Sequence, residues 1–156
     1  MKINIINVAN KMPNWVTVAC GEYLSRINHG KYSCKIIEIK SERQNNKPIL
    51  ENMAIEAHKI KAQVPDNSYI IALDENGKNF NSIKFADELE KISLNNANIT
   101  FIIGGADGIH PALKQQANLQ IQLSALTFPH ALVRIIILEQ IYRALSILEN
   151  HPYHRE

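Results

Sequence analysis

The sequence has little cysteine, no long apolar run and no strong excess of one charge. Cys20 and Cys34 stand alone without a C-x-x-C pair, which argues against a zinc site and a disulfide scaffold and suits a reducing cytosol. No apolar stretch approaches the roughly 20 residues of a membrane helix, and the start lacks the apolar core of a signal peptide. We therefore expect a cytoplasmic protein with no membrane segment and no metal site.

Two signals of nucleotide or nucleic-acid binding are also missing. The formal net charge is only +2 over 156 residues, whereas dedicated nucleic-acid modules usually carry a marked basic excess. If the chain handles RNA, its affinity must come from local patches, from dimerisation or from a large preorganised substrate. Neither G-x-G-x-x-G nor G-x-x-x-x-G-K-[ST] occurs, which disfavours dinucleotide and nucleoside triphosphate ligands.

What is present is an alternation of strand-like and helical segments. The short apolar runs with strand character are residues 3–6, 35–39, 69–73, 99–103 and 119–123. The segments with helical spacing are 15–26, 48–64, 82–92, a short stretch after 111, and 129–150. This order predicts an α/β domain with a mostly parallel sheet covered by helices. Because no linker or repeat interrupts it, we expect a single domain over residues 1–156.

Ligands of such sheets bind beyond the carboxyl ends of the strands, here in the loops after residues 73, 103 and 123. Asn76-Gly77 predicts a turn in the first of these loops. Glycines at 104, 105 and 108 would let backbone groups of the second loop approach a nucleotide-like ligand, although an ordinary tight turn explains them equally well. The third loop, 123–130, is apolar but holds two hydroxyls, so it either packs inside or closes over a flat base.

The last helix is apolar almost all the way round from residue 132 to 138, which indicates burial on more than one side. A helix of a second copy is our preferred partner, and a helix enclosed within one subunit is the alternative. Arg134 lies among these apolar residues and needs a partner, which we place across the dimer. Glu139 and Arg143, four residues apart, predict a minor surface salt bridge.

The end of the chain, residues 151–155, carries two imidazoles, a phenol and a guanidinium. Such groups stack on bases, donate hydrogen bonds and contact phosphate. A frayed terminus without a function is the alternative that its position suggests.

Taken together and in order, these motifs resemble the SPOUT-class methyltransferases and, more closely, the RlmH family of ribosomal RNA large-subunit methyltransferases. The residues that carry the resemblance are Lys11-Met12-Pro13, Leu73-Asp74, Gly77-Lys78, Ile103-Gly104-Gly105, Gly108, 123–127, Pro129-His130, 132–134, Glu139, 142–144 and 151–155. They extend over nearly the whole chain. The glycine loop alone is a weak signal, whereas the ordered set is specific.

The resemblance implies an α/β knot, a topology that is rare among proteins in general, and no separate RNA-binding domain. It implies S-adenosylmethionine (SAM) as cofactor, bound in the knot. The residues that it places at the cofactor are Leu73, Gly104, Leu123, Ser124, Ala125, Leu126, Thr127 and Phe128. It further implies a homodimer that methylates N3 of a pseudouridine in the large-subunit (23S) rRNA of assembled ribosomes.

The chemistry then requires little from side chains, because the sulfonium of SAM is already an activated methyl donor. The proton on pseudouridine N3 must leave, and we take His154 as the candidate catalytic base because imidazole titrates near neutral pH. Tyr153 and Arg155 are expected to hold the substrate RNA. Two alternatives remain: a SPOUT enzyme that acts on transfer RNA, and a flavodoxin-like nucleotide-binding module without catalysis.

Overall fold

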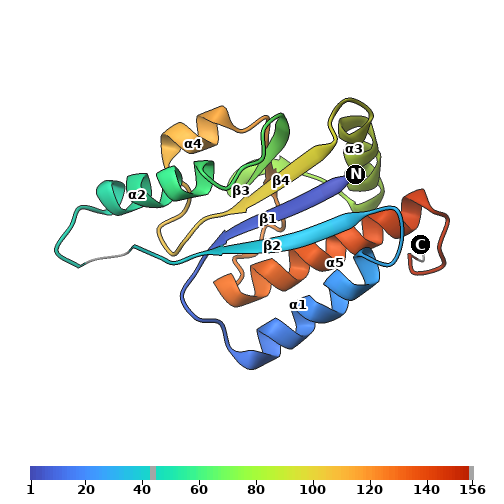
Figure 1. The fold of residues 1–156 in the computed structure, drawn as a ribbon, viewed down its shortest axis with the longest axis horizontal. Coiled ribbons are helices and arrows are strands. Elements are labelled where there is room, and N and C mark those ends of the chain that lie inside the picture. The colour runs from blue at the N-terminus through green and yellow to red at the C-terminus, as the bar shows by residue number, and fades with distance from the viewer. Residues whose placement is uncertain (43–44, 155–156) are drawn as a thin grey trace.

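The computed structural model describes residues 1–42 and 45–154, which form a five-stranded sheet with helices on both faces (Figure 1). The strands are β1 (Lys2–Val8), β2 (Ser33–Ile39), β3 (Ser68–Asn79), β4 (Asn98–Ile103) and β5 (Leu119–Gln122). Their order in the sheet is β2-β1-β4-β3-β5, and every neighbouring pair is parallel. The predicted α/β class and parallel sheet are therefore confirmed.

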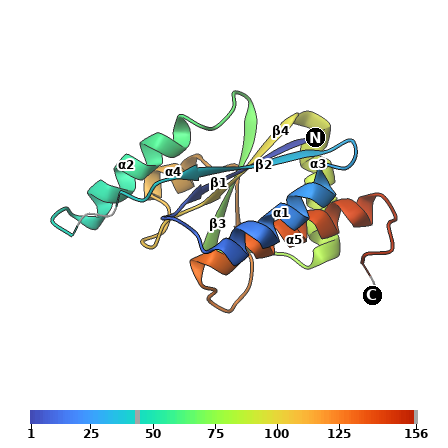
Figure 2. The same cartoon turned by 60° about the horizontal axis from the view of Figure 1, so that its bottom comes forward.

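The helices divide between the two faces of the sheet (Figures 1 and 2). They are α1 (Asn14–Ile27), α2 (Ile49–Lys61), α3 (Ser82–Asn95), α4 (Pro111–Gln116) and α5 (His130–Leu148). Successive side chains of β1 point to opposite faces. Ile3 and Ile5 accordingly join the core beneath α1, α3 and α5, whereas Ile6 and Val8 join the core beneath α2 and α4. Among the described residues, no helix is both long and apolar enough to cross a bilayer.

The local signals at the helix starts behave as the sequence predicts. The side chain of Asn81 accepts a hydrogen bond from the backbone N–H of Lys84 (2.8 Å) and so caps α3. Pro48 and Pro129 each stand immediately before a helix, and Pro111 is the first residue of α4. Proline suits these positions because the first N–H groups of a helix have no partner within it.

The apolar circumference of α5 is covered largely within one subunit. The helix lies against α1 on one side and α3 on the other, and Ile137, Leu138 and Ile141 are fully buried. This is the alternative that the sequence left open, so the apolar character of α5 by itself does not require a second copy. Leu132 nevertheless remains 37% exposed near the start of the helix.

The turn predicted at Asn76-Gly77 is wrong in one respect, because β3 continues through it to Asn79. The pairing with β5 shifts register there, so that Leu73 and Lys78 both pair with Ile121. A Cβ atom on Gly77 would lie 2.5 Å from the backbone carbonyl carbon of Ile121. Gly77 thus allows the bulged β3 to approach β5 closely. The sequence pattern Asn-Gly does not distinguish this role from that of a turn glycine.

Candidate functional site

A cavity of about 370 Å³ opens beside the second half of β3 and at the carboxyl ends of β4 and β5. Its walls are residues 73–76 within β3, the last residues of β4 and β5, the loops that follow these two strands, and Val133 of α5. All eight residues that the sequence placed at a cofactor line it: Leu73, Gly104, Leu123, Ser124, Ala125, Leu126, Thr127 and Phe128. The structure therefore brings three segments that are distant in sequence to one cavity. Their contact with a cofactor stays a prediction.

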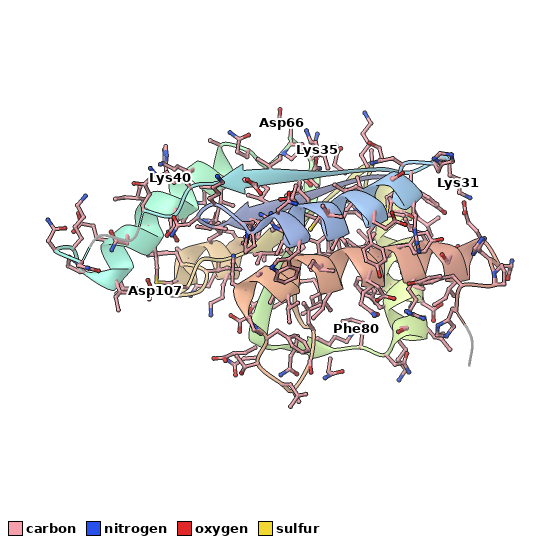
Figure 3. All side chains as sticks on the ribbon, turned by 90° about the horizontal axis from the view of Figure 1, so that it is seen from below. Lys31, Lys35, Lys40, Asp66, Phe80 and Asp107 are labelled. Atoms are coloured by element: carbon pink, nitrogen blue, oxygen red, sulfur yellow. The ribbon has the colours of Figure 1, made fainter. Side chains whose placement is uncertain are left out.

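The glycines after β4 form a closed turn that is one wall of the cavity. The N–H of Gly108 donates to the carbonyl oxygen of Gly105 (3.0 Å), and Gly108 has a φ of +87°, which favours glycine. A Cβ on Gly104 would lie 2.5 Å from the carbonyl carbon of Gly108. Asp107 of this turn lies at the end of the molecule from which α5 starts (Figure 3). The segment is thus both a tight turn and part of the cavity.

The apolar loop 123–128 is tied by one of its own hydroxyls. Ser124 Oγ accepts a hydrogen bond from the backbone N–H of Leu126 (3.0 Å). The side chain of Leu126 is 74% exposed, whereas Leu123 and Phe128 are half-buried. The loop therefore leaves Leu126 exposed at the cavity, whereas Leu123 also packs against the core.

Asp74 is a cavity residue that the sequence placed in a family motif but not among the residues at the cofactor. Its Oδ2 accepts from Lys114 Nζ (2.8 Å) on α4, and its Oδ1 accepts from the N–H of Asn76 (3.0 Å). Burial alone would raise the pKa of Asp74, but the hydrogen bonds from Lys114 and Asn76 bring it below its ordinary value. Asp74 and Lys114 are 40 residues apart, so no local pattern could have paired them.

A polar network around the buried Arg134 lies beneath the first turns of α5, next to the loop 123–128. Arg134 is 2% exposed, and its Nη1 donates to Glu38 Oε1 (2.6 Å) on β2. With its amide turned to suit both neighbours, Asn7 of β1 donates to His130 Nε2 (3.1 Å) and accepts from Arg134 Nε (3.2 Å). The partner of Arg134 is therefore within its own chain, and our placement of that partner across a dimer is wrong.

The network makes stability depend on pH through His130. Burial lowers the pKa of His130, and Arg134 adds to this, while the backbone of Val8 and Glu56 act in the opposite direction. Below the ordinary pKa of about 6.5, the unfolded chain takes up a proton at this histidine that the folded chain resists. The free energy of unfolding should therefore fall as the pH drops below 6.5, by less than about 1.4 kcal/mol per pH unit.

The measurement is urea denaturation at pH 7.5 and pH 5.5 for the wild type and His130→Gln. Glutamine keeps a donor and an acceptor at this position but does not titrate. We expect the loss of stability between the two pH values to be smaller in His130→Gln. An identical loss in both proteins would exclude His130 as its source.

The residues predicted to act on RNA lie at the other end of α5. Tyr153 Oη donates to Glu139 Oε1 (3.3 Å), and the ring of Tyr153 packs edge-on against Tyr142 with centroids 4.7 Å apart. Arg143 Nε donates to Glu139 Oε1 (2.9 Å), and Arg143 Nη1 lies 3.4 Å from His154 Nδ1. The Glu139–Arg143 pair is therefore partly buried and holds the tail, so its predicted role as a minor surface pair is wrong.

The tail and the cavity are far apart within one chain. Arg155, the third predicted RNA contact, lies outside the described residues. The cavity borders the start of α5 and the tail follows its end, and 19 residues of helix span about 28 Å. Figure 1 shows that α5 runs across the molecule, so that the tail after its last residue lies far from its start. The structure thus gathers the predicted cofactor residues in one place but leaves His154 and Tyr153 in another.

Comparison with known proteins identifies relatives along the full chain. A family model described as "Predicted SPOUT methyltransferase" matches residues 1–154. Proteins named ribosomal RNA large subunit methyltransferase H from Chromobacterium violaceum and Neisseria gonorrhoeae are 43% and 42% identical over 100% of both chains. The Paraburkholderia phymatum protein of the same name is 41% identical over 99% of both chains.

A likeness to a solved structure concerns the fold alone. Lpg2936 from Legionella pneumophila, solved in complex with SAM, superposes with a TM-score of 0.53 at 13% sequence identity. The alignment covers 93% of this chain but 66% of that one, so the chain spans slightly less than two thirds of that protein's length.

Proposed function

Because the chain belongs to the SPOUT methyltransferases, in the family of the ribosomal RNA large subunit methyltransferases H, we propose that it transfers a methyl group from SAM to large-subunit ribosomal RNA. The observation that carries this proposal is the cavity between residues 73–76 of β3 and the carboxyl ends of β4 and β5. Eight residues that the resemblance places at the cofactor line it together. Ribosomes are cytoplasmic, and we place the protein there with them.

The residues of the cavity fit such a cofactor. Leu73, Ile103 and Leu123 offer apolar surface to an adenine ring, and the absence of a side chain on Gly104 leaves backbone groups within reach. Asp74 offers a carboxylate that suits a cationic ligand. When bound, SAM supplies an activated methyl group, so that the protein's task is to align donor and acceptor.

The proposed acceptor is N3 of a pseudouridine. In the reaction the N3–H bond breaks, a bond forms between N3 and the methyl carbon, and the electron pair of the methyl–sulfur bond remains on sulfur. His154 is the candidate group that takes the proton from N3. Tyr153 and Arg155 are the candidate groups that hold the target base and its backbone, by stacking and by charge.

These roles require two copies of the chain. Since about 28 Å of α5 separate His154 from the cavity of its own subunit, we propose a homodimer in which the tail of one subunit reaches the cavity of the other. The neighbouring helices α1 and α5 offer a surface for this dimer interface at the end of the molecule where the cavity lies. Trp15 and Val18 of α1 are 53% and 63% exposed, and Leu132 of α5 is 37% exposed. Exposed apolar side chains in the first turns of two neighbouring helices favour a protein interface.

Leu132→Asp is therefore expected to convert a dimer into a monomer without unfolding the subunit. The aspartate would remain solvated in the monomer but would be buried without a partner in the dimer. Sedimentation velocity at micromolar concentration measures the change. Ile137→Asp is the contrasting variant: Ile137 is fully buried inside the subunit, so this change should destroy the fold itself. A wild-type chain that sediments as a monomer would refute the dimer.

The substrate is tested by transfer of a radiolabelled methyl group from SAM. We expect label in the large-subunit RNA of intact ribosomes and little in free subunits or in bulk transfer RNA. Label in transfer RNA alone would favour the alternative SPOUT activity. Binding of SAM with no transfer to any RNA would favour a nucleotide-binding module without catalysis.

A further inference from the structure

The charged residues that line the cavity all have the same sign. Asp74 and Glu75 are both carboxylates, whereas none of the described residues in the cavity wall is a lysine, an arginine or a histidine. The other polar side chains there are uncharged: Asn76, Gln122, Ser124 and Thr127. A ligand in the cavity is therefore exposed to a negative potential from its walls.

The two carboxylates differ in how firmly they are held. The side chain of Asp74 is 12% exposed and is fixed by Lys114 and by the N–H of Asn76, whereas Glu75 is exposed to solvent. Lys114 does not line the cavity, so the carboxylate of the ion pair is nearer to a bound ligand than the ammonium is. The charge of Glu75 is screened by water, which leaves Asp74 as the stronger source of the potential.

SAM and the product of methyl transfer differ mainly in charge. Both contain adenosine and an amino acid, but the sulfonium of SAM is cationic and the thioether of S-adenosylhomocysteine is not. The positive charge disappears when the electron pair of the methyl–sulfur bond remains on sulfur. A negative wall therefore attracts the cofactor before the reaction more strongly than the product after it.

We propose that Asp74, oriented by Lys114, makes the cavity select the cationic sulfonium over the uncharged thioether and so favours release of the product. This inference rests on the proposed use of SAM but assigns a specificity-determining residue, Asp74, and a positioning residue, Lys114. The pair joins Asp74, next to the predicted cofactor residue Leu73, to Lys114 of α4.

Calorimetric titration with SAM and with S-adenosylhomocysteine tests the proposal in the wild type, Asp74→Asn and Lys114→Met. Asp74→Asn keeps the shape and an acceptor for Lys114 but removes the charge. We expect it to weaken binding of SAM on the order of fivefold, which corresponds to about 1 kcal/mol, and to leave binding of the thioether nearly unchanged. Lys114→Met removes the compensating charge and should increase the preference for SAM. Glu75→Gln, the matched change at an exposed carboxylate, should alter the preference less than Asp74→Asn.

The opposite effects of the two variants separate selection by charge from a structural role. If Asp74→Asn and Lys114→Met weaken both ligands in parallel, the ion pair merely shapes the cavity and the proposal is overturned. If Lys114→Met does not fold, the proposal is tested by Asp74→Asn and by the salt dependence of the wild-type preference for SAM. A preference that is electrostatic must shrink as salt is added. A wild type that binds neither ligand would refute the proposed function as well, whereas equal changes in both ligands refute this inference alone.

Discussion

Gly104→Val is expected to weaken binding of SAM on the order of 100-fold or more while the chain remains folded. A Cβ at this position would lie 2.5 Å from the carbonyl carbon of Gly108 and 2.8 Å from Cγ1 of Ile109. The backbone of the turn 104–108 must then move, and this turn is a wall of the cavity. The sheet itself should survive, since β4 ends at Ile103, before the substituted residue.

Calorimetry with SAM and thermal unfolding measure the two halves of this prediction separately. The matched control is Gly21→Ala in α1, where a Cβ would meet no atom within 4 Å. Because glycine in a helix is less favourable than alanine, Gly21→Ala should stabilise the fold by up to about 1 kcal/mol and leave the affinity for SAM unchanged. An unchanged affinity in Gly104→Val would remove Gly104 from the cofactor site.

Mixing two inactive variants is expected to restore methyl transfer. One is Gly104→Val, which has an intact tail but a defective cavity, and the other is His154→Ala, which has an intact cavity but lacks the candidate base. If the tail acts on the partner's cavity, each mixed dimer contains one complete site. With random exchange of subunits, half of the dimers are mixed, so about a quarter of the wild-type activity should return.

Each variant alone should have little activity on saturating ribosomes in single-turnover experiments. His154→Ala should retain the wild-type affinity for SAM, because His154 lies at the far end of α5 from the cavity of its own chain. The control mixture combines His154→Ala with a chain that carries both substitutions, which offers no intact tail and should stay inactive. Failure of the first mixture to regain activity, with subunit exchange verified, would contradict a tail that acts between subunits.

A series of pH values separates binding from proton transfer at His154. If His154 takes the proton from the target base, His154→Ala should lower the single-turnover rate more than it lowers ribosome affinity, and it should change the pH profile. A wild-type rate with an unchanged profile would leave only a binding role for the tail. Substitution of Tyr153 is a weaker test of RNA binding, because its ring also packs on Tyr142 and Arg143. Its removal would disturb the tail whether or not Tyr153 contacts RNA.

The sequence by itself determined the order of elements and the general place of the site. Apolar runs of strand length, helical spacing between them and capping residues such as Asn81 act over a few neighbouring residues, so they can be read locally. The parallel sheet follows from their alternation. The carboxyl ends of the strands and the ordered family motifs were then enough to name eight residues that line one cavity.

The tertiary structure decided which distant side chains meet. Lys114 pairs with Asp74 across 40 residues, and Arg134 pairs with Glu38 across 96, so neither contact leaves a pattern in the surrounding sequence. For the same reason the apolar run of α5 did not show whether a partner subunit or α1 and α3 of its own chain cover this helix. The separation of His154 from the cavity is likewise a property of the packed helix, since only the direction of α5 across the sheet sets where its two ends lie.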